Sequence, residues 1–121
     1  MRVMLVDDSR TMRTVERDIL KSLGSKEIEE ACDVHDALSK ITAFQPDLML
    51  VDWDLPELDG LELVRRVRER GESIPIILIT ERTERSRILE AIHEGVNNVV
   101  AKPFTAEVMI KRIQDTMTRA A

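Results

Sequence analysis

The stretch that decides the fold is DLMLVDWDLPELDG, residues 47–60. Its apolar start, DLMLV (47–51), predicts a short strand that is covered on both faces. The following DWDLPELDG (52–60) is rich in residues typical of turns. From Leu61 the apolar residues recur at helical spacing. The stretch therefore predicts a buried strand, a loop and a helix, which is the repeating unit of parallel sheets.

The same unit recurs on both sides of this stretch, because apolar runs alternate with amphipathic segments along the whole chain. The expected strands are residues 3–6, 27–31, 47–51, 74–80 and 98–101. The expected helices run from Ser9 to Leu23, from Val34 up to Pro46, from Leu61 to Gly71, from Arg82 to Glu94, and through Val108 to Met117. Five strands that alternate with five helices predict an α/β fold with a parallel sheet and helices on both faces.

The first expected helix shows the clearest amphipathic pattern. Met12, Val15, Ile19 and Leu23 recur at spacings of three and four, which predicts that they form its core-facing side. Gly24 follows in the position that favours a left-handed residue and is expected to end the helix. No linker or low-complexity segment divides residues 1–121, so we expect a single domain.

Composition excludes several functional classes. The net charge of −5 and the pI near 5.1 argue against a nucleic-acid-binding surface. Cys32 is the only cysteine, which excludes an internal disulfide and suits a reducing compartment. His35 and His93 are too far apart in sequence to suggest a zinc site. There is neither an apolar run long enough to span a membrane nor a signal-peptide core, and a soluble cytoplasmic protein is expected.

Polar residues stand where the expected strands end. Asp7 and Asp8 follow the first strand, Asp52 the third, Thr80 ends the fourth, and Lys102 follows the fifth. Ligands of such sheets bind at the carboxyl ends of the strands, so these side chains are expected at one edge. Clustered carboxylates favour a hard divalent ion such as Mg²⁺. A metal ion, a lysine and a hydroxyl can together hold a phosphoryl group, and an aspartate can be its acceptor.

Ordinary structural roles are the alternatives for these residues. The double aspartate could cap the following helix, although Ser9 could do so alone. Asp52 could be a turn residue, Thr80 an ordinary strand terminus, and Lys102 a solvated surface lysine. The Asp59-Gly60 pair is interpreted as a turn that leads into the third helix.

Four short motifs carry a resemblance to a known family. VDD (6–8), LVDWDLPELDG (50–60), LIT (78–80) and AKPF (101–104) resemble those of the receiver domains of two-component response regulators. The motifs occur in the family's order, and the resemblance covers the whole chain. Within the family, the sequence most resembles the stand-alone chemotaxis regulators. It implies a flavodoxin-like fold with strand order 2-1-3-4-5.

The resemblance also implies which residues form the site. Asp52 would accept a phosphoryl group from the phosphohistidine of a histidine kinase. Asp7 and Asp8 would hold Mg²⁺ together with Asp52 and the backbone carbonyl of Asp54. The chain would catalyse only its own phosphorylation and dephosphorylation, and would not be an enzyme in the ordinary sense.

The remaining implied roles concern signalling. Lys102 would pair with the phosphoryl group, and its bond to Pro103 would be cis. Thr80 would move towards the phosphoryl oxygens and trigger a change in a protein-binding surface. That surface would lie on the helix at 82–94, the strand at 98–101 and the last helix, and would bind a downstream protein.

Three features depart from the family's usual pattern. Glu81 stands where a small residue is usual, and we expect it to slow phosphorylation by small anionic donors. The resemblance implies that Asp54 and Arg82 border the path of the hydrolytic water, where they could form an ion pair that influences the lifetime of the phosphoryl group. Val99 replaces the usual aromatic of the switch.

Trp53 is interpreted as a loop aromatic, and Mg²⁺ binding is expected to change its fluorescence. The charged run ERTERSR (81–87) is either a solvated helix face or part of a partner surface. Two alternative functions remain open. One is a degenerate receiver that binds partners without phosphorylation, and the other is a small aspartyl-phosphate phosphohydrolase.

Overall fold

A parallel sheet forms the centre of the fold. In the computed structural model, which describes residues 1–120, its five strands lie in the order β2-β1-β3-β4-β5. The strands are β1 (Arg2–Val6), β2 (Glu27–Ala31), β3 (Leu48–Asp52), β4 (Ile76–Thr80) and β5 (Asn98–Ala101). The helices are α1 (Arg10–Ser22), α2 (Val34–Phe44), α3 (Gly60–Glu69), α4 (Arg85–His93) and α5 (Ala106–Ala120). The predicted α/β fold and its strand order are confirmed.

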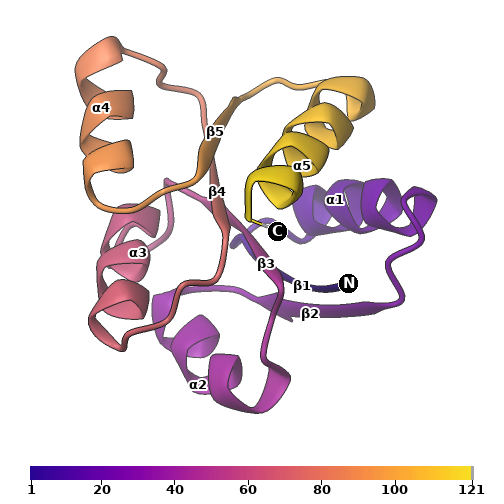
Figure 1. Ribbon diagram of the computed structural model, residues 1–121, viewed down its shortest axis with the longest axis horizontal. Helices are drawn as coiled ribbons and strands as arrows, with labels where there is room; N and C mark the ends of the chain where they lie inside the picture. The colour runs from indigo at the N-terminus through magenta and orange to yellow at the C-terminus, as the bar shows by residue number, and fades with distance from the viewer. Residues whose placement is uncertain (121) are drawn as a thin grey trace.

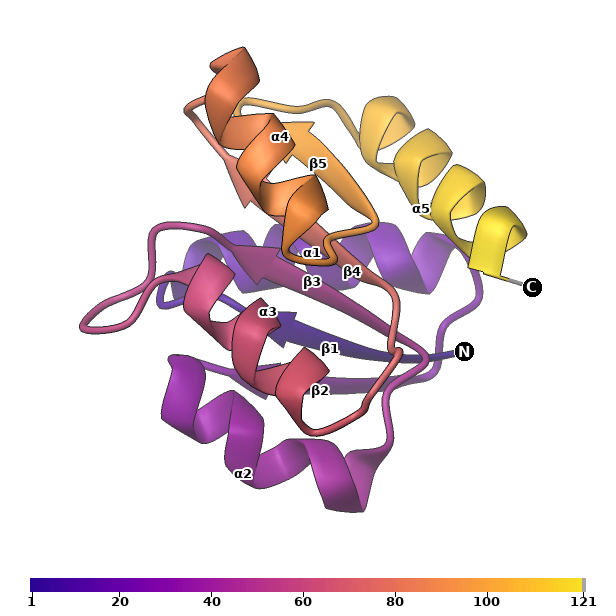
Figure 2. The ribbon, with the colours of Figure 1, turned by 60° about the vertical axis from the view of Figure 1, so that its left-hand side comes forward.

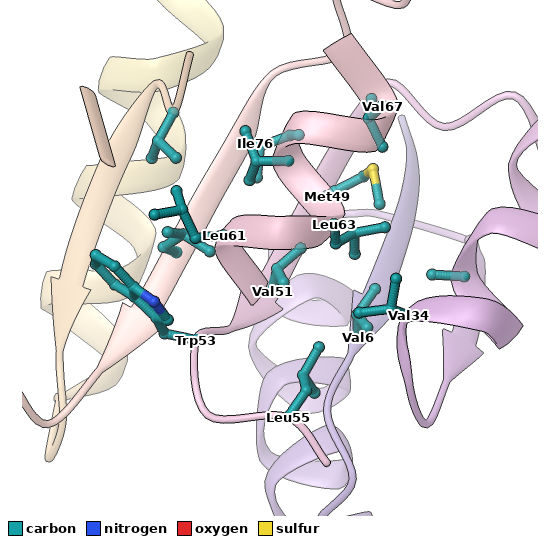
Figure 3. Packing of buried hydrophobic residues seen from close by; sticks show 14 of the residues in the cluster. Val6, Val34, Met49, Val51, Trp53, Leu55, Leu61, Leu63, Val67 and Ile76 are labelled. Atoms are coloured by element: carbon teal, nitrogen blue, oxygen red, sulfur yellow. The ribbon is translucent and has the colours of Figure 1, made fainter. Parts of the chain in front are cut away.

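Helices cover both faces of the sheet (Figure 1). Helices α1 and α5 lie on one face, and α2, α3 and α4 lie on the other. Each face has its own apolar core, because strand side chains alternate between the two sides. The core under α1 and α5 includes Leu5, Leu50 and Ile79, and the core under the other three helices includes Val6, Val51 and Leu78. Figure 3 shows the packing of the second core.

The carboxyl ends of the strands meet at one edge of the sheet. In the parallel register, Val6 is aligned with Val51, Asp52 with Ile79, and Thr80 with Ala101. The arrowheads of β1 and β3 point towards the same edge in Figure 2. Strands β3 and β4 are buried along their whole length, which explains their continuous apolar sequences. This register delivers the polar residues at the strand ends to a common place.

Two helix starts at this edge are capped by side chains. The Ser9 hydroxyl accepts a hydrogen bond from the Met12 N–H (3.2 Å), and the Asp59 carboxylate accepts one from the Glu62 N–H (2.9 Å). Such caps satisfy N–H groups that have no partner within the helix. The expected capping by Ser9 is confirmed. The Asp59-Gly60 pair leads into the third helix as expected, but it forms the cap and first residue of α3 rather than a separate turn.

Gly60 allows α3 to begin close to the end of β3. A Cβ atom at this position would overlap the backbone carbonyl oxygen of Asp52 and lie 2.9 Å from the Cα of Trp53. Only a residue without a side chain fits this approach. Gly60 thereby brings the first turn of α3 against the backbone that carries Asp52.

The prediction of which residues of the first helix face the core is partly wrong. Val15 is 43% exposed, whereas Glu16 is buried together with Ile19 and Leu20. The helix is rotated by about one residue from the orientation that apolar spacing predicts. Apolar spacing could not find this orientation, because it counts a glutamate as a solvent-facing residue.

Two predicted boundaries differ from the structure by two or three residues. The fourth strand begins at Ile76, because Pro75 has no N–H to donate to the sheet. The fourth helix begins at Arg85, after the extended residue Glu84, which makes no side-chain cap. Arg82 therefore lies in a loop. Among residues 1–120, no helix is both long enough and apolar enough to cross a membrane.

Candidate functional site

Three aspartates form an acidic cluster at the carboxyl edge of the sheet. Asp7 and Asp8 directly follow β1, and Asp52 is the last residue of β3. One carboxylate oxygen from each lies within 4.8 Å of the others. Asp7 and Asp52 are buried, whereas Asp8 is exposed to solvent. The sequence-based expectation that these three side chains come together is confirmed.

Hydrogen bonds orient the two buried aspartates. The Asp7 Oδ1 atom accepts from the Ser9 N–H (2.8 Å), and the Asp52 Oδ1 atom accepts from the Asp54 N–H (3.1 Å). The Asp7 Oδ2 atom is buried and has no hydrogen-bond partner among residues 1–120. A buried carboxylate oxygen without a partner is costly. A cation bound between the carboxylates would satisfy it, so the cluster fits an oxygen-liganded divalent ion.

Lys102 closes the other side of the cluster. Its ammonium Nζ donates a hydrogen bond to the Asp52 Oδ2 atom (3.2 Å), and its side chain is 16% exposed. Burial alone would lower the pKa of Lys102, but the neighbouring Asp52, Asp7 and Glu81 charges outweigh it and raise this pKa. The lysine is therefore held as a cation beside Asp52. Its peptide bond to Pro103 is cis, as the resemblance implies.

Burial changes the acidity of the two buried aspartates. It raises the pKa of Asp7 to about 6, opposed by the hydrogen bond from Ser9. Burial also raises the pKa of Asp52, opposed by the N–H of Asp54 and by Lys102. Both shifts come mainly from burial, with smaller contributions from the charges of neighbouring aspartates.

Thr80 lies at the end of β4, at the same edge. It is fully buried, and its hydroxyl oxygen accepts a hydrogen bond from the Arg82 N–H (3.0 Å). The register places it opposite Ala101, directly before Lys102. The structure thus brings the threonine to the edge that carries Asp52 and Lys102.

The expected ion pair between Asp54 and Arg82 is wrong. Arg82 instead contacts Glu84, with 3.3 Å between its Nε atom and the Glu84 Oε1 atom. The partner of Asp54 is Arg87, whose Nη2 atom lies 3.6 Å from the Asp54 Oδ1 atom. The reason is the late start of α4, which leaves Arg82 in an exposed loop and turns Arg87 towards the end of β3.

Trp53 is more than a loop aromatic. Although it follows β3, its side chain is only 1% exposed and belongs to the core that α3 covers. The guanidinium of Arg87 lies over the indole ring, 3.7 Å from its centroid. The interpretation of Trp53 as a loop aromatic is correct for its position after β3, but the sequence did not predict that the side chain is buried. Its neighbour in sequence is the buried Asp52, so it is well placed to report on the site.

Glu16 is a buried acid near the site that sequence reasoning missed. It is 1% exposed, and its Oε2 atom has no hydrogen-bond partner among residues 1–120. Burial raises the pKa of Glu16 to about 9, with smaller contributions from the charges of Asp7 and Asp52. Its side chain is therefore protonated and neutral at pH 7. Its position could have indicated burial, because residues three and four apart share a helix face. Ile19 and Leu20 follow Glu16 at these two spacings.

Two other predicted positions lie around the site. Glu81 is exposed, and its charge contributes to the raised pKa of Lys102, so it acts electrostatically on that lysine. Val99 is partly buried in β5 and lines a hollow with Ile88, Ile92 and Arg112. The structure places Glu81 directly after β4, at the carboxyl edge of the sheet, and Val99 in β5, which lies between α4 and α5 (Figure 1).

Comparisons with known proteins agree on one family. The chain matches the family described as response regulator receiver domain over residues 3–114. It is 36% identical over 121 residues to the chemotaxis protein CheY of Pseudomonas aeruginosa, with 98% of each chain covered. It is 37% identical over 117 residues to CheY1 of Helicobacter pylori, with 94% of each chain covered. The solved structure of Vibrio cholerae CheY4 has a TM-score of 0.88 and 30% identity, and the match covers 95% of this chain and 97% of that one.

Proposed function

We propose that this chain, which belongs to the response regulator receiver family, is a single-domain switch in which Asp52 accepts a phosphoryl group from a histidine kinase. The observation that carries the proposal is the position of the Asp52 carboxylate. Its Oδ2 atom accepts a hydrogen bond from the ammonium of Lys102, and one of its oxygens lies within 4.8 Å of carboxylate oxygens of Asp7 and Asp8. One side of Asp52 can thus face a cation site, and the other faces a fixed positive charge.

Mg²⁺ is the proposed cofactor, held by Asp7, Asp8, Asp52 and the backbone carbonyl of Asp54. Bound there, it supplies positive charge to the oxygens of the transferred group. Without such compensation, three aspartates would repel a phosphoryl dianion. The acidic cluster therefore supports a metal-dependent reaction.

The transfer needs one nucleophile and balanced charges. An Asp52 oxygen forms a bond to phosphorus while the bond between phosphorus and the histidine nitrogen breaks, and the imidazole leaves with a proton from solvent. Lys102, which contacts Asp52 before transfer, pairs with the phosphoryl oxygens afterwards. The Thr80 hydroxyl exchanges its contact with the Arg82 N–H for one to a phosphoryl oxygen. The resulting movement of the β4–α4 loop is the proposed signal.

The proposed output is binding to a downstream protein. Leu89 and Ile92 on α4 are 54% and 55% exposed, and Val108 on α5 is 45% exposed. A contiguous group of exposed apolar side chains is typical of a protein-binding surface, and Ile92 lines one hollow with Val99. With Val99 on β5 they define the α4–β5–α5 face that we propose as the partner surface. The relatives from Pseudomonas aeruginosa and Helicobacter pylori are named chemotaxis proteins, which supports a chemotaxis pathway for this chain.

The direct test is phosphorylation by acetyl phosphate, followed by intact-protein mass spectrometry. We expect one phosphoryl group to be incorporated with Mg²⁺ and almost none with EDTA. The adduct should be cleaved by hydroxylamine, as an acyl phosphate is. A protein that stays unmodified under both conditions would instead support a degenerate receiver, and repeated turnover of phosphate esters would support a phosphohydrolase.

Mg²⁺ binding is expected to change the fluorescence of Trp53. The buried indole directly follows Asp52, so a divalent charge at the acidic cluster alters its electrostatic environment. The measurement is a Mg²⁺ titration of wild type, with Asp8→Asn as the site variant and Asp18→Asn on the exposed side of α1 as the control. A flat titration of the folded wild-type protein would contradict the metal site.

Glu81→Ala is expected to react about twofold to fivefold faster with acetyl phosphate, which corresponds to up to roughly 1 kcal/mol for a solvent-exposed charge. The reason is that Glu81 places a negative charge near Lys102 on the side where an anionic donor approaches. The control is Glu69→Ala, which removes the same charge from the far end of α3. Equal rates for the two variants would show that Glu81 has no special effect.

A further inference from the structure

Arg87 is the side chain that connects α4 to the end of β3. Its guanidinium lies 3.7 Å from the ring centroid of Trp53, and its Nη2 atom lies 3.6 Å from the Asp54 Oδ1 atom. The side chain is 20% exposed, and its Nε atom is buried without a hydrogen-bond partner among residues 1–120. Figure 3 shows the Trp53 ring in the packed layer beside Leu61, so the ring is a fixed platform for the guanidinium.

Asp54 is directly linked to Asp52. Its backbone N–H donates a hydrogen bond to the Asp52 Oδ1 atom, and its negative charge contributes to the raised pKa of Asp52. Its side chain is 59% exposed, so the carboxylate can turn either towards Arg87 or towards the space in front of Asp52. A free carboxylate there would add to the charge that opposes an anionic phosphodonor.

We propose that Arg87 is a positioning residue that holds the Asp54 carboxylate on α4 and keeps its charge from opposing phosphoryl transfer to Asp52. The inference rests on the proposed function of Asp52 and names a determinant of that reaction. Trp53 fixes the guanidinium by a cation–π contact, which a lysine reproduces less well because it lacks the planar group. Arg87 acts only through Asp54 and does not touch the transferred group.

Few other contacts hold α4 in this orientation. Ala91 is its only fully buried residue within the part of the chain that the structure describes, and its first turn has no side-chain cap. Leu89 and Ile92 face solvent. The contacts of Arg87 with Trp53 and Asp54 therefore tie the phosphoacceptor loop to the helix that carries the proposed partner surface.

The test is a double-mutant cycle on the rate of phosphorylation by acetyl phosphate with Mg²⁺. Its members are wild type, Arg87→Ala, Asp54→Asn and the double variant. Arg87→Ala should be about twofold to fivefold slower than wild type, the range expected for an ion pair in which one partner is exposed. In the Asp54→Asn background, Arg87→Ala should have no effect, because the carboxylate that it positions is absent. Arg85→Ala is the control, since it removes an exposed arginine from the same helix.

Two further readouts separate positioning from a general structural role. Arg87→Lys should recover only part of the rate, because lysine keeps the charge but reproduces the contact with Trp53 less well, and the rate loss of Arg87→Ala should shrink at high salt. Trp53 emission should change in Arg87→Ala and stay as in wild type in Arg85→Ala, because only Arg87 stacks on the indole.

Each outcome of the cycle has a definite meaning. A slowing by Arg87→Ala that persists in the Asp54→Asn background overturns the positioning role, as does a wild-type rate for Arg87→Ala. Both results leave the proposed function of Asp52 intact. A wild-type protein that takes up no phosphoryl group overturns the proposed function and this inference together.

Discussion

Glu16→Gln is expected to be more stable than wild type by about 3 kcal/mol at pH 7, and to have nearly the same stability at pH 4.5. In the folded protein, burial raises the pKa of Glu16 from its ordinary 4.5 to about 9. The folded state therefore keeps a proton that the unfolded state loses above pH 4.5. Raising the pH favours the unfolded state by about 1.4 kcal/mol per unit until the folded pKa is passed.

The measurement is urea denaturation of both proteins at pH 5, 7 and 8.5. The difference in the free energy of unfolding should grow with pH, because glutamine has a similar shape and does not titrate. Asp18→Asn is the control, two residues further along α1 on its exposed side, and it should leave the slope unchanged. Parallel stability curves for Glu16→Gln and wild type would mean that Glu16 is ionised in the folded protein.

The protonation of Glu16 also matters for the acidic cluster. Asp7 and Asp52 are already buried with raised pKa values, and the charges of both act on Glu16. An ionised Glu16 would add a fourth negative charge to the same region. In its neutral form, Glu16 leaves the cluster with a charge that one divalent ion and Lys102 can balance.

Asp7→Asn is expected to weaken Mg²⁺ binding by at least about tenfold, which corresponds to about 1.4 kcal/mol. Asp7 contributes the buried Oδ2 atom that has no partner among residues 1–120, and the amide cannot supply its negative charge. Phosphorylation at a fixed, subsaturating Mg²⁺ concentration should fall by a similar factor. Isothermal titration calorimetry measures the affinity directly.

The control for this variant is again Asp18→Asn, which removes one negative charge from α1 outside the cluster. If Asp7→Asn bound Mg²⁺ as tightly as wild type, Asp7 would not be a ligand. If Asp18→Asn weakened binding equally, the effect would be one of net charge rather than of a specific site.

The fold and most of the site could be predicted because they depend on local patterns. The continuous apolar sequences of β3 and β4 indicated buried parallel strands, and parallel strands bring their carboxyl ends to one edge. Residues that directly follow a strand, such as Asp7 and Lys102, therefore had to lie at this carboxyl edge. Capping by Ser9 followed from the chemistry of its side chain.

The features that could not be predicted depend on contacts between distant segments. The rotation of α1 that buries Glu16 depends on the shape of the sheet beneath it, to which apolar spacing is insensitive. The pairing of Asp54 with Arg87 depends on where α4 begins, and the first turn of α4 carries no capping side chain that marks it. The burial of Trp53 depends on α3, which approaches the end of β3 through Gly60.

The most direct test of the account is to locate the phosphoryl group after reaction with acetyl phosphate and Mg²⁺. Reduction with borohydride converts a phosphorylated aspartate to homoserine, which peptide mass spectrometry identifies. We predict homoserine at position 52 in wild type, and no incorporation in Asp52→Asn. Incorporation that survives in Asp52→Asn, or homoserine at another aspartate of wild type, would contradict the assignment of Asp52 as the phosphoacceptor.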